Sequence, residues 1–398
     1  MTSKYWALAA VAVLTPITVG SAFAEKKYAP GVTDAEIKIG QTMPYSGPAS
    51  AWGTLGLAER AYFKMINEQG GVNGRKIKLI SLDDAFSAPK TFEQTRKLVE
   101  EERVAVVFGS AGGTTNLAVR KYLNDNRVPQ LFALTASVEF NDPQHFPWTI
   151  GILPTLYLEG QIYARYILAH KPSAKIGVLH ATGPTGKEGV DGLKNGLGEK
   201  AGRLIVKEQS YEESDPTIYS QIVTLKASGA DTLYNISSPK FATQSIRKAS
   251  EIGWKPLHFL SYGSQSISAV LEPAGLENSI GVISATFGKD PADPRWKDDP
   301  NTREYLDWLQ TYYPGGKAAD IFIIAGYAYP QLLIYVLKQC GDDLSRENIM
   351  RQATNLHEVA MPWLLPGITL GTTPTDYQPI KQLHEMRFNG KTWELMNE

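Results

Sequence analysis

The sequence predicts an α/β fold built from two doubly wound, Rossmann-like lobes. At 398 residues the chain is too long for one ordinary domain and long enough for two, each with its own hydrophobic core. Apolar runs of strand length alternate with segments of helix length in units of about thirty residues, as in βαβ structures. The alternation begins again past Pro154, which indicates a second sheet of similar size.

The first unit alternates strands with helices. Strand 37–45 (IKIGQTMPY) is followed by a helix that two glycines end, and Pro89 stands in the first turn of the next helix, where its missing amide costs nothing. Strands connected through helices lie parallel, with helices on both faces of the sheet. The predicted strands are 37–45, 75–84 and 104–110, and the predicted helices are 55–71 and 88–102.

The second unit repeats this pattern. Its predicted strands are 174–183, 203–211, 231–237 and 256–263, and its predicted helices include 216–229 and 239–253. Ligands of such sheets bind outside the carboxyl ends of the strands, so the turns after the strands are the predicted site. These turns are 43–53, 83–89, 109–116, 134–140, 182–188, 236–240 and 261–266.

Small, glycine and hydroxyl residues dominate these turns. GSAGGTTN (109–116) exposes backbone amides ahead of a predicted helix, which favours an anionic group. The turn 134–140 offers Thr135, Ala136 and Ser137 in the same way. The alternative is that these segments are loops without a binding role.

Composition and charge exclude several function classes. With 40 Lys+Arg against 41 Asp+Glu, the net charge of -1 provides no basic surface for nucleic acid. Cys340 is the only cysteine, which excludes an internal disulfide and a cysteine-rich metal cluster.

The N-terminus reads as an export signal. Lys4 precedes an apolar run from Trp6 to Val19, and the small residues Ala22 and Ala24 predict signal-peptide cleavage after Ala24. The alternative is an N-terminal membrane anchor. No later stretch reads as long and apolar enough to span a bilayer, so we expect a periplasmic protein without membrane insertion.

Catalytic and cofactor motifs are absent from the sequence. GPTGKEG (183–189) fails the phosphate-loop spacing, and GSAGGT lacks the spacing of a dinucleotide turn. The six histidines are scattered without ligand spacing. Asp83 and Asp84 are either a pair of catalytic carboxylates or, as we favour, turn and helix caps. We therefore predict no enzymatic activity, no metal and no cofactor.

The pieces SGPASAWG (46–53), INEQGGVNGRKI (66–77), DDAFSAPKTFEQTRKLV (83–99) and VAVVFG (104–109) occur in this order within residues 43–110. This run closely resembles the start of the branched-chain amino-acid-binding proteins of bacterial ABC transporters, which are type I periplasmic binding proteins. The likeness continues through residues 227–255 to the C-terminus and covers nearly the whole mature chain. The resemblance implies two lobes that close on a small ligand, a membrane permease as partner, and a monomer. A ligand sensor of the same fold is the alternative role.

The resemblance also implies that three crossings connect the lobes. In this sequence they fall near residues 151–154, 286–289 and 366–369. The expected first lobe comprises 25–151 and 288–366, and the expected second lobe comprises 152–287 and 367–398, after a signal peptide at 1–24.

Site residues carried over from the family begin with Trp52, which the resemblance places in the cleft against the apolar part of the ligand. The turn around Gly113 and Thr114 and the turn Thr135-Ala136-Ser137 match those that hold a ligand carboxylate. The alternative for Trp52 is a packed core residue.

The second lobe departs from the amino-acid pattern. The turn SYGSQS (261–266) has no acid where the family places a glutamate for the ligand's ammonium group, and an unpaired buried ammonium is costly. Two positions at which the family often has tyrosine hold Thr185 and Ser238 in this sequence. The two positions of the family's cystine loop hold Phe86 and Gly112. We therefore expect a carboxylate ligand without an amino group, such as an aromatic acid; a true branched-chain amino acid is the alternative. The other candidate contacts in this lobe are Tyr157, Tyr262, Ser264 and Gln265.

Overall fold

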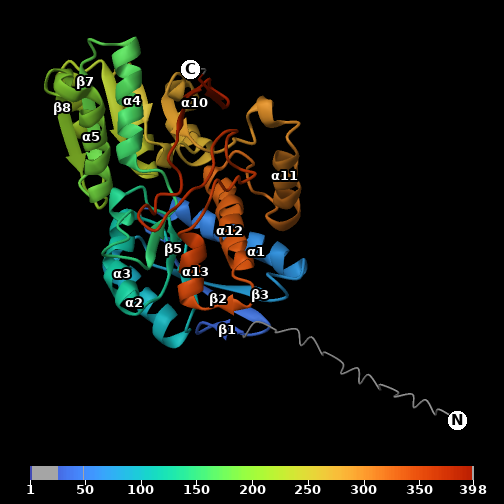
Figure 1. The fold of residues 1–398 in the computed structure, drawn as a ribbon. Coiled ribbons are helices and arrows are strands. Elements are labelled where there is room, and N and C mark those ends of the chain that lie inside the picture. The colour runs from blue at the N-terminus through green and yellow to red at the C-terminus, as the bar shows by residue number, and fades with distance from the viewer. Residues whose placement is uncertain (2–25, 48, 397–398) are drawn as a thin grey trace.

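The computed structural model describes residues 1, 26–47 and 49–396. The predicted export signal therefore lies outside the described residues except for Met1, and so does Pro48. Two sheets organise the described chain, each covered by helices on both faces (Figure 1). The predicted α/β architecture with two Rossmann-like lobes is confirmed.

The first sheet has five parallel strands in the order β3-β2-β4-β5-β6. The apolar side chains of β2, β4, β5 and β6 are buried, as expected for a sheet with helices on both faces, whereas the edge strand β3 is only partly buried. We call this sheet and its helices the first lobe. The strands are β2 (Glu36–Met43), β3 (Lys76–Asp83), β4 (Val106–Phe108), β5 (Gln130–Ala133) and β6 (Thr149–Gly151). The helices are α1 (Gly53–Glu68), α2 (Ala88–Arg96), α3 (Gly113–Asp125), α11 (Pro300–Tyr312), α12 (Ile321–Gln339) and α13 (Arg346–Ala353), and a small pair joins β1 (Lys27–Tyr28) to β12 (Asp343–Leu344).

The second sheet has seven strands in the order β14-β13-β11-β10-β9-β7-β8 and forms the second lobe with its helices. The strands are β7 (Ile176–Ala181), β8 (Ile205–Tyr211), β9 (Thr232–Ile236), β10 (Leu257–Leu260), β11 (Ile283–Thr286), β13 (His384–Phe388) and β14 (Trp393–Leu395). The helices are α4 (Leu156–His170), α5 (Pro184–Leu197), α6 (Ala201–Leu204), α7 (Tyr219–Ala227), α8 (Pro239–Glu251), α9 (Glu272–Ala274) and α10 (Leu276–Ser279).

The last two strands differ from the expected all-parallel arrangement. β13 pairs antiparallel with β11, and β14 pairs antiparallel with β13. A tight turn at residues 389–392 is enough to connect β13 to β14, since antiparallel strands need no helical crossover. The second sheet is therefore mixed.

The chain passes between the two sheets three times, after β6, after β11 and between α13 and β13. The second and third passages pair through backbone bonds: the Leu365 amide donates to the Phe287 carbonyl (3.0 Å) and the Lys289 amide to the Trp363 carbonyl (2.9 Å). The chain beyond residue 369 still contacts the first lobe, since the Tyr377 amide donates to Asn141 Oδ1 (2.6 Å). We therefore propose that the third crossing lies at residues 378–383, later than the sequence suggested.

Helix α12 corrects the expectation that no later stretch is long and apolar enough to cross a membrane. By length and composition it qualifies, with a mean hydropathy of 1.5. Most of it is buried, and it packs on α1 so closely that a Cβ at Gly326 would lie 2.5 Å from the Leu55 carbonyl oxygen. These contacts are those of a core helix.

Helices α4 and α5 lie side by side in the second lobe (Figure 1) and touch through glycines. A Cβ at Gly192 would overlap the backbone of Tyr157. We expect Gly192→Ala to lower the free energy of unfolding by about 3 kcal/mol, because neither backbone can give way without separating the helices. Urea denaturation measures this loss, and exposed Gly202, whose Cβ would meet open space, provides the matched control Gly202→Ala. Equal effects of the two changes would contradict the prediction.

Candidate functional site

The carboxyl ends of both sheets border one cavity of about 490 Å³ between the lobes. Each of the seven turns predicted from the sequence contributes to its wall, together with the turn after β8. Nine predicted site residues line it: Trp52, Gly113, Thr114, Thr135, Ala136, Thr185, Ser238, Tyr262 and Ser264. Residues far apart in the sequence thus meet, because both sheets direct these ends toward the same space.

Three helices begin at this cavity. Helices α3, α5 and α8 start at Gly113, Pro184 and Pro239, and the first turn of each, or the residue before it, lies in the cavity wall. The first amides of a helix have no partner inside the helix, and its N-terminus carries a partial positive charge. The cavity is therefore suited to a negatively charged group.

The two lobes approach each other closely here. A Cβ at Gly113 would lie 2.5 Å from Thr185 Oγ1, so only glycine allows α3 and α5 to come this near. Thr135 is almost fully buried, and the Thr114 hydroxyl lies near Gly183 of the second lobe. The structure thus describes the lobes in a closed arrangement.

Trp52 ends a short helical turn, Ser50–Trp52, and borders the cavity from the first lobe. Its ring packs edge-on against Phe86, with centroids 5.5 Å apart. The Phe86 ring in turn lies over Gly112, where a Cβ would clash with it. The two cystine-loop positions are therefore neighbours, and an aromatic contact stands in their place. The indole Nε1 of Trp52 is buried without a hydrogen-bond partner among the described residues.

Tyr262 borders the same cavity from the second lobe, and hydrogen bonds fix it at both ends. Its hydroxyl donates to the Pro154 carbonyl (2.6 Å), and its amide donates to Glu159 Oε1 (2.7 Å). Glu159 is completely buried, which raises its pKa to about 7, and Tyr234 also donates to it. This network holds the tyrosine ring in position.

Three predicted site residues lie elsewhere. Ser137 and Tyr157 are not in the cavity wall: Ser137 bonds to Glu188, and Tyr157 sits half-buried on α4 against α5. Gln265 lines a second, smaller chamber that adjoins the first. Its side-chain oxygen accepts from Ser284 (3.2 Å).

Sequence reasoning missed Glu213, which lines the cavity from the turn after β8. Ser238 Oγ donates to Glu213 Oε2 (2.9 Å), and burial raises the pKa of this carboxyl group. The turn 261–266 indeed lacks an acid, but the cavity does not. The argument against an ammonium-bearing ligand therefore fails, and applying the strand-end rule to the end of β8 at Tyr211 would have found Glu213.

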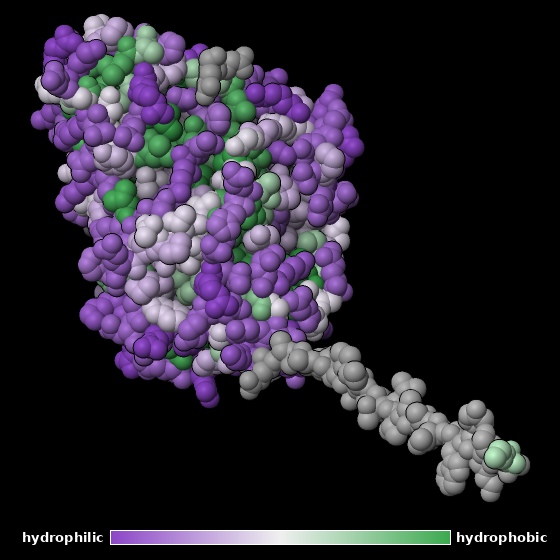
Figure 2. Space-filling model, in the orientation of Figure 1, coloured by the Kyte–Doolittle hydropathy of each residue, from purple (hydrophilic) through white to green (hydrophobic). Residues whose placement is uncertain are grey.

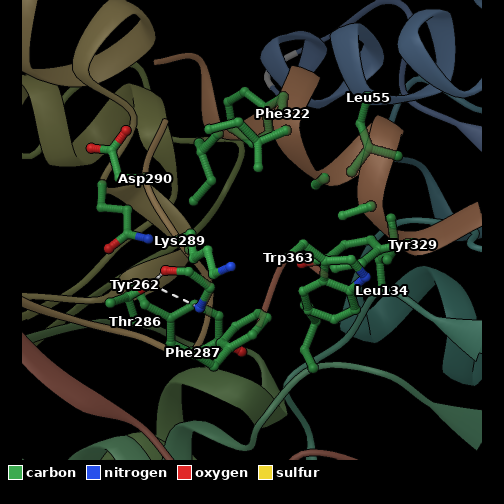
Figure 3. A pocket seen from close by; sticks show the side chains of 18 of the residues that line it. Leu55, Leu134, Tyr262, Thr286, Phe287, Lys289, Asp290, Phe322, Tyr329 and Trp363 are labelled. Atoms are coloured by element: carbon green, nitrogen blue, oxygen red, sulfur yellow. Dashed lines mark hydrogen bonds between the residues drawn. The ribbon is translucent and has the colours of Figure 1, made fainter. Parts of the chain in front are cut away.

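The second chamber has a volume of about 150 Å³ and lies between β11, α12 and the segment around Trp363. Figure 3 shows side chains from α1, α12 and the second crossing around a central space, with carbon atoms forming most of the wall. Five residues border both cavities: Trp52, Leu134, Leu153, Tyr262 and Gly263. The chambers are thus adjacent, with Trp52 and Tyr262 at their boundary.

The two adjacent aspartates after β3 serve the turn, as expected for caps. Asp83 accepts from Ser46 and Lys90, and Asp84 accepts from the Phe86 amide (2.9 Å) and the Thr91 hydroxyl (2.9 Å). Within the described ranges no group of three or more His, Cys, Asp or Glu side chains is placed to hold a metal ion.

The profile of the family described as "Periplasmic binding protein" matches residues 36–392. The chain belongs to this family. It is a type I periplasmic binding protein related to the Leu/Ile/Val-binding proteins, as the sequence pieces predicted. Members of this family are periplasmic binding proteins.

Three relatives illustrate the range of this periplasmic binding protein family. A "Leu/Ile/Val-binding protein homolog 1" of Brucella abortus is 25% identical over 317 residues, or 79% of this chain and 81% of that protein. A Thermus thermophilus branched-chain amino acid ABC transporter structure with bound valine has a TM-score of 0.81 at 16% identity, covering 92% of this chain and 97% of that one. A Thermomonospora curvata structure described as a fatty acid ABC transporter substrate-binding protein has a TM-score of 0.78 at 19% identity and covers 94% of both chains.

A polar contact connects the lobes of this binding protein at the rim of the cavity. Ser137 Oγ donates to Glu188 Oε1 (2.5 Å), and the Val138 amide donates to Glu188 Oε2 (2.8 Å). Because Glu188 is on α5 and the two donors follow β5, the bonds form only when the lobes are closed. Burial raises the pKa of Glu188 in this arrangement.

We expect Glu188→Ala to shift the ligand-free protein toward open forms, since two bonds made only in the closed state are lost. Small-angle X-ray scattering should report a larger radius of gyration, and ligand affinity should fall by about tenfold, or roughly 1.4 kcal/mol. The exposed Asp191 on the same helix supplies the control Asp191→Ala. An unchanged scattering profile and affinity in Glu188→Ala would show that this contact does not contribute to closure.

Proposed function

We propose that this protein is the solute-binding component of an ABC transporter and captures a small carboxylate ligand between its two lobes. The observation that carries the proposal is the cavity of about 490 Å³ at which α3, α5 and α8 begin. The ligand stabilises the closed form, and the closed form delivers it to a membrane permease. The predicted signal peptide, with cleavage after Ala24, supports a periplasmic location.

The carboxylate binds at the start of α3. Thr114 and Thr135 offer hydroxyl groups, and the amides of the first turn of α3 are free to donate. Charge-assisted bonds of this kind are stronger than neutral ones and do not require an arginine. Thr185 adds a hydroxyl from the second lobe, so the same group contacts both lobes in the closed form.

An aromatic or other apolar part of the ligand lies between Trp52 and Tyr262. Both residues border the cavity, and hydrogen bonds and packing fix both rings. Aromatic contacts add about 0.5 to 1.5 kcal/mol beyond simple burial. An aromatic acid therefore suits this cavity.

A second candidate, an α-amino acid, is favoured by Glu213. Its buried carboxylate lies in the cavity wall of the second lobe, opposite the first-lobe helix that would hold the ligand carboxylate. A ligand ammonium would pair with it and return its pKa toward the ordinary range. The Thermus thermophilus neighbour with bound valine and the Leu/Ile/Val-binding homologue support this candidate.

Isothermal titration of ligand-stripped protein with matched pairs tests the proposal. Each pair differs only in the amino group: phenylalanine with 3-phenylpropanoate, and leucine with 4-methylpentanoate, supplemented by hydroxybenzoates and dicarboxylates. Binding of either compound of a pair supports a carboxylate site. The compound that binds more tightly shows whether the ligand is an amino acid or an acid without an amino group. Binding of neutral amides or sugars with no response to any carboxylate would overturn the proposal.

Glu213→Gln separates the two candidates. If the ligand is an amino acid, the change removes the partner of its ammonium group, and affinity should fall by about 30-fold or more, or roughly 2 kcal/mol. If the ligand is a simple acid, the affinity should stay the same or rise, since a buried negative charge near the ligand is removed.

A further inference from the structure

The chamber beside the main cavity is lined mainly by apolar side chains from parts of the chain that the expected site did not include. Leu55 comes from α1, Phe322 from α12, and Trp363 from the segment that pairs with the second crossing (Figure 3). Ala325 of α12 also lines the chamber. Met386 and Trp393 of the second sheet complete the apolar wall. Both lobes therefore contribute to it, so the chamber is complete only when they are closed.

The charged side chains and the Thr286 hydroxyl at the chamber wall have partners within the protein, whereas the indole Nε1 atoms of Trp52 and Trp363, which also line it, have none among the described residues. Lys289 Nζ is 2.7 Å from Asp299 Oδ2, and both side chains are largely buried. Asp290 accepts from the Ala292 amide (2.9 Å), and Thr286 Oγ1 donates to the Gly288 carbonyl (2.9 Å). Lys289 and Asp290 bring opposite charges to this wall, and Lys289 is also paired with Asp299.

The volume fits a small ring. An apolar cavity of about 150 Å³ stays dry and holds a benzene-sized molecule. The chamber has about this volume, and Trp52 and Tyr262 are among the five residues that line both it and the main cavity. A ligand group that extends past these residues leaves the cavity with the hydroxyl groups and helix N-termini and enters a chamber with a more apolar wall.

We propose that the chamber receives a neutral apolar end of the ligand, of phenyl size, while the carboxylate stays in the main cavity. This inference rests on the proposed function for the carboxylate and extends it. It assigns the preferred ligand to long amphipathic acids, an aryl or acyl group joined to a carboxylate by a short chain. Chain length, rather than the carboxylate alone, then determines affinity.

Titration with ω-phenylalkanoates tests the proposal: phenylacetate, 4-phenylbutanoate, 6-phenylhexanoate and 8-phenyloctanoate. We expect the affinity to rise by about 10- to 100-fold to the member whose ring fills the chamber, as burial of a ring predicts, and then to fall. Equal affinities across the series would overturn the proposal. So would tighter binding of 4-(trimethylammonio)butanoate than of 4-phenylbutanoate, because the chamber would then hold a cation.

Two variants locate the effect. Ala325→Leu fills the chamber, so the best-binding acid of the series should bind with nearly the same affinity as phenylacetate, the shortest one. The exposed control Ala227→Leu should keep the affinity ratio of the wild type. Phe322→Ala enlarges the chamber, so the acid that binds most tightly should have a longer chain than for the wild type. This variant tests the proposal even if Ala325→Leu does not fold. Wild-type behaviour of a folded chamber variant would overturn the proposal.

Fluorobenzene, observed by ¹⁹F NMR, separates this proposal from the proposed function, since it has no carboxylate. Binding to the wild type that Ala325→Leu abolishes supports the chamber even if no carboxylate binds anywhere. No binding of fluorobenzene or of any long acid, with short carboxylates still bound, overturns the chamber alone. No binding of any carboxylate overturns the proposed function.

Discussion

Replacing Trp52 by alanine is expected to weaken binding of the tightest carboxylate by about 30- to 1,000-fold, or roughly 2 to 4 kcal/mol. The indole borders both cavities and packs edge-on against Phe86, so its loss opens a void at their boundary. Its buried Nε1 has no partner among the described residues and is free to donate to a ligand oxygen. Trp52→Phe, which keeps an aromatic ring but loses the donor, should cost less.

Titration calorimetry measures these affinities, and tryptophan fluorescence also reports on this residue, because quenching by the ligand should weaken in Trp52→Phe. Trp148 is the matched control: it is a half-buried tryptophan of the first lobe outside both cavities, and Trp148→Ala should not change affinity. If Trp52→Ala binds as tightly as the wild type, Trp52 is a packing residue and the role assigned to it is wrong.

The order of strands and helices could be predicted because each element has a local signature. The apolar run after residue 36 becomes β2, the run of alternating polar and apolar residues after residue 75 becomes β3, and the amphipathic segment between them becomes α1. Parallel connection then places the strand ends together, so Trp52 and Tyr262 could be assigned to one site although they lie more than 200 positions apart.

Glu213 was missed, and the apolar chamber could not be predicted, for different reasons. A glutamate after a strand has the same appearance as a solvated turn residue, and Glu213 follows β8, whose end was left out when the strand-end rule was applied. Ala325 and Phe322 have the pattern of core residues on an apolar helix, and a sequence does not reveal whether such residues fill the space between helices or leave a chamber. The pairing of β13 with β11 was also not predicted from the sequence, since it joins segments about a hundred residues apart.

A buried carboxyl group in the first lobe makes stability depend on pH. Glu59 of α1 is fully buried, and Gln41 of β2 donates to its Oε2, while Oε1 has no partner among the described residues. Burial raises the pKa of Glu59 from 4.5 to about 8. The folded protein therefore keeps a proton that the unfolded chain has already released, so the stabilising contribution is complete below about pH 4.5 and is lost as the pH rises to about 8.

Glu59→Gln is expected to flatten this dependence. The amide resembles the neutral carboxyl group, its oxygen can accept from Gln41, and it does not ionise. The free energy of unfolding of the wild type, from urea denaturation between pH 5 and pH 9, should fall by roughly 3 to 5 kcal/mol more than that of the variant. Exposed Glu101 supplies the control Glu101→Gln, which should follow the wild type. Parallel curves for the wild type and Glu59→Gln would mean that Glu59 is ionised in the folded protein, with a cation or water supplying the partner that its Oε1 lacks.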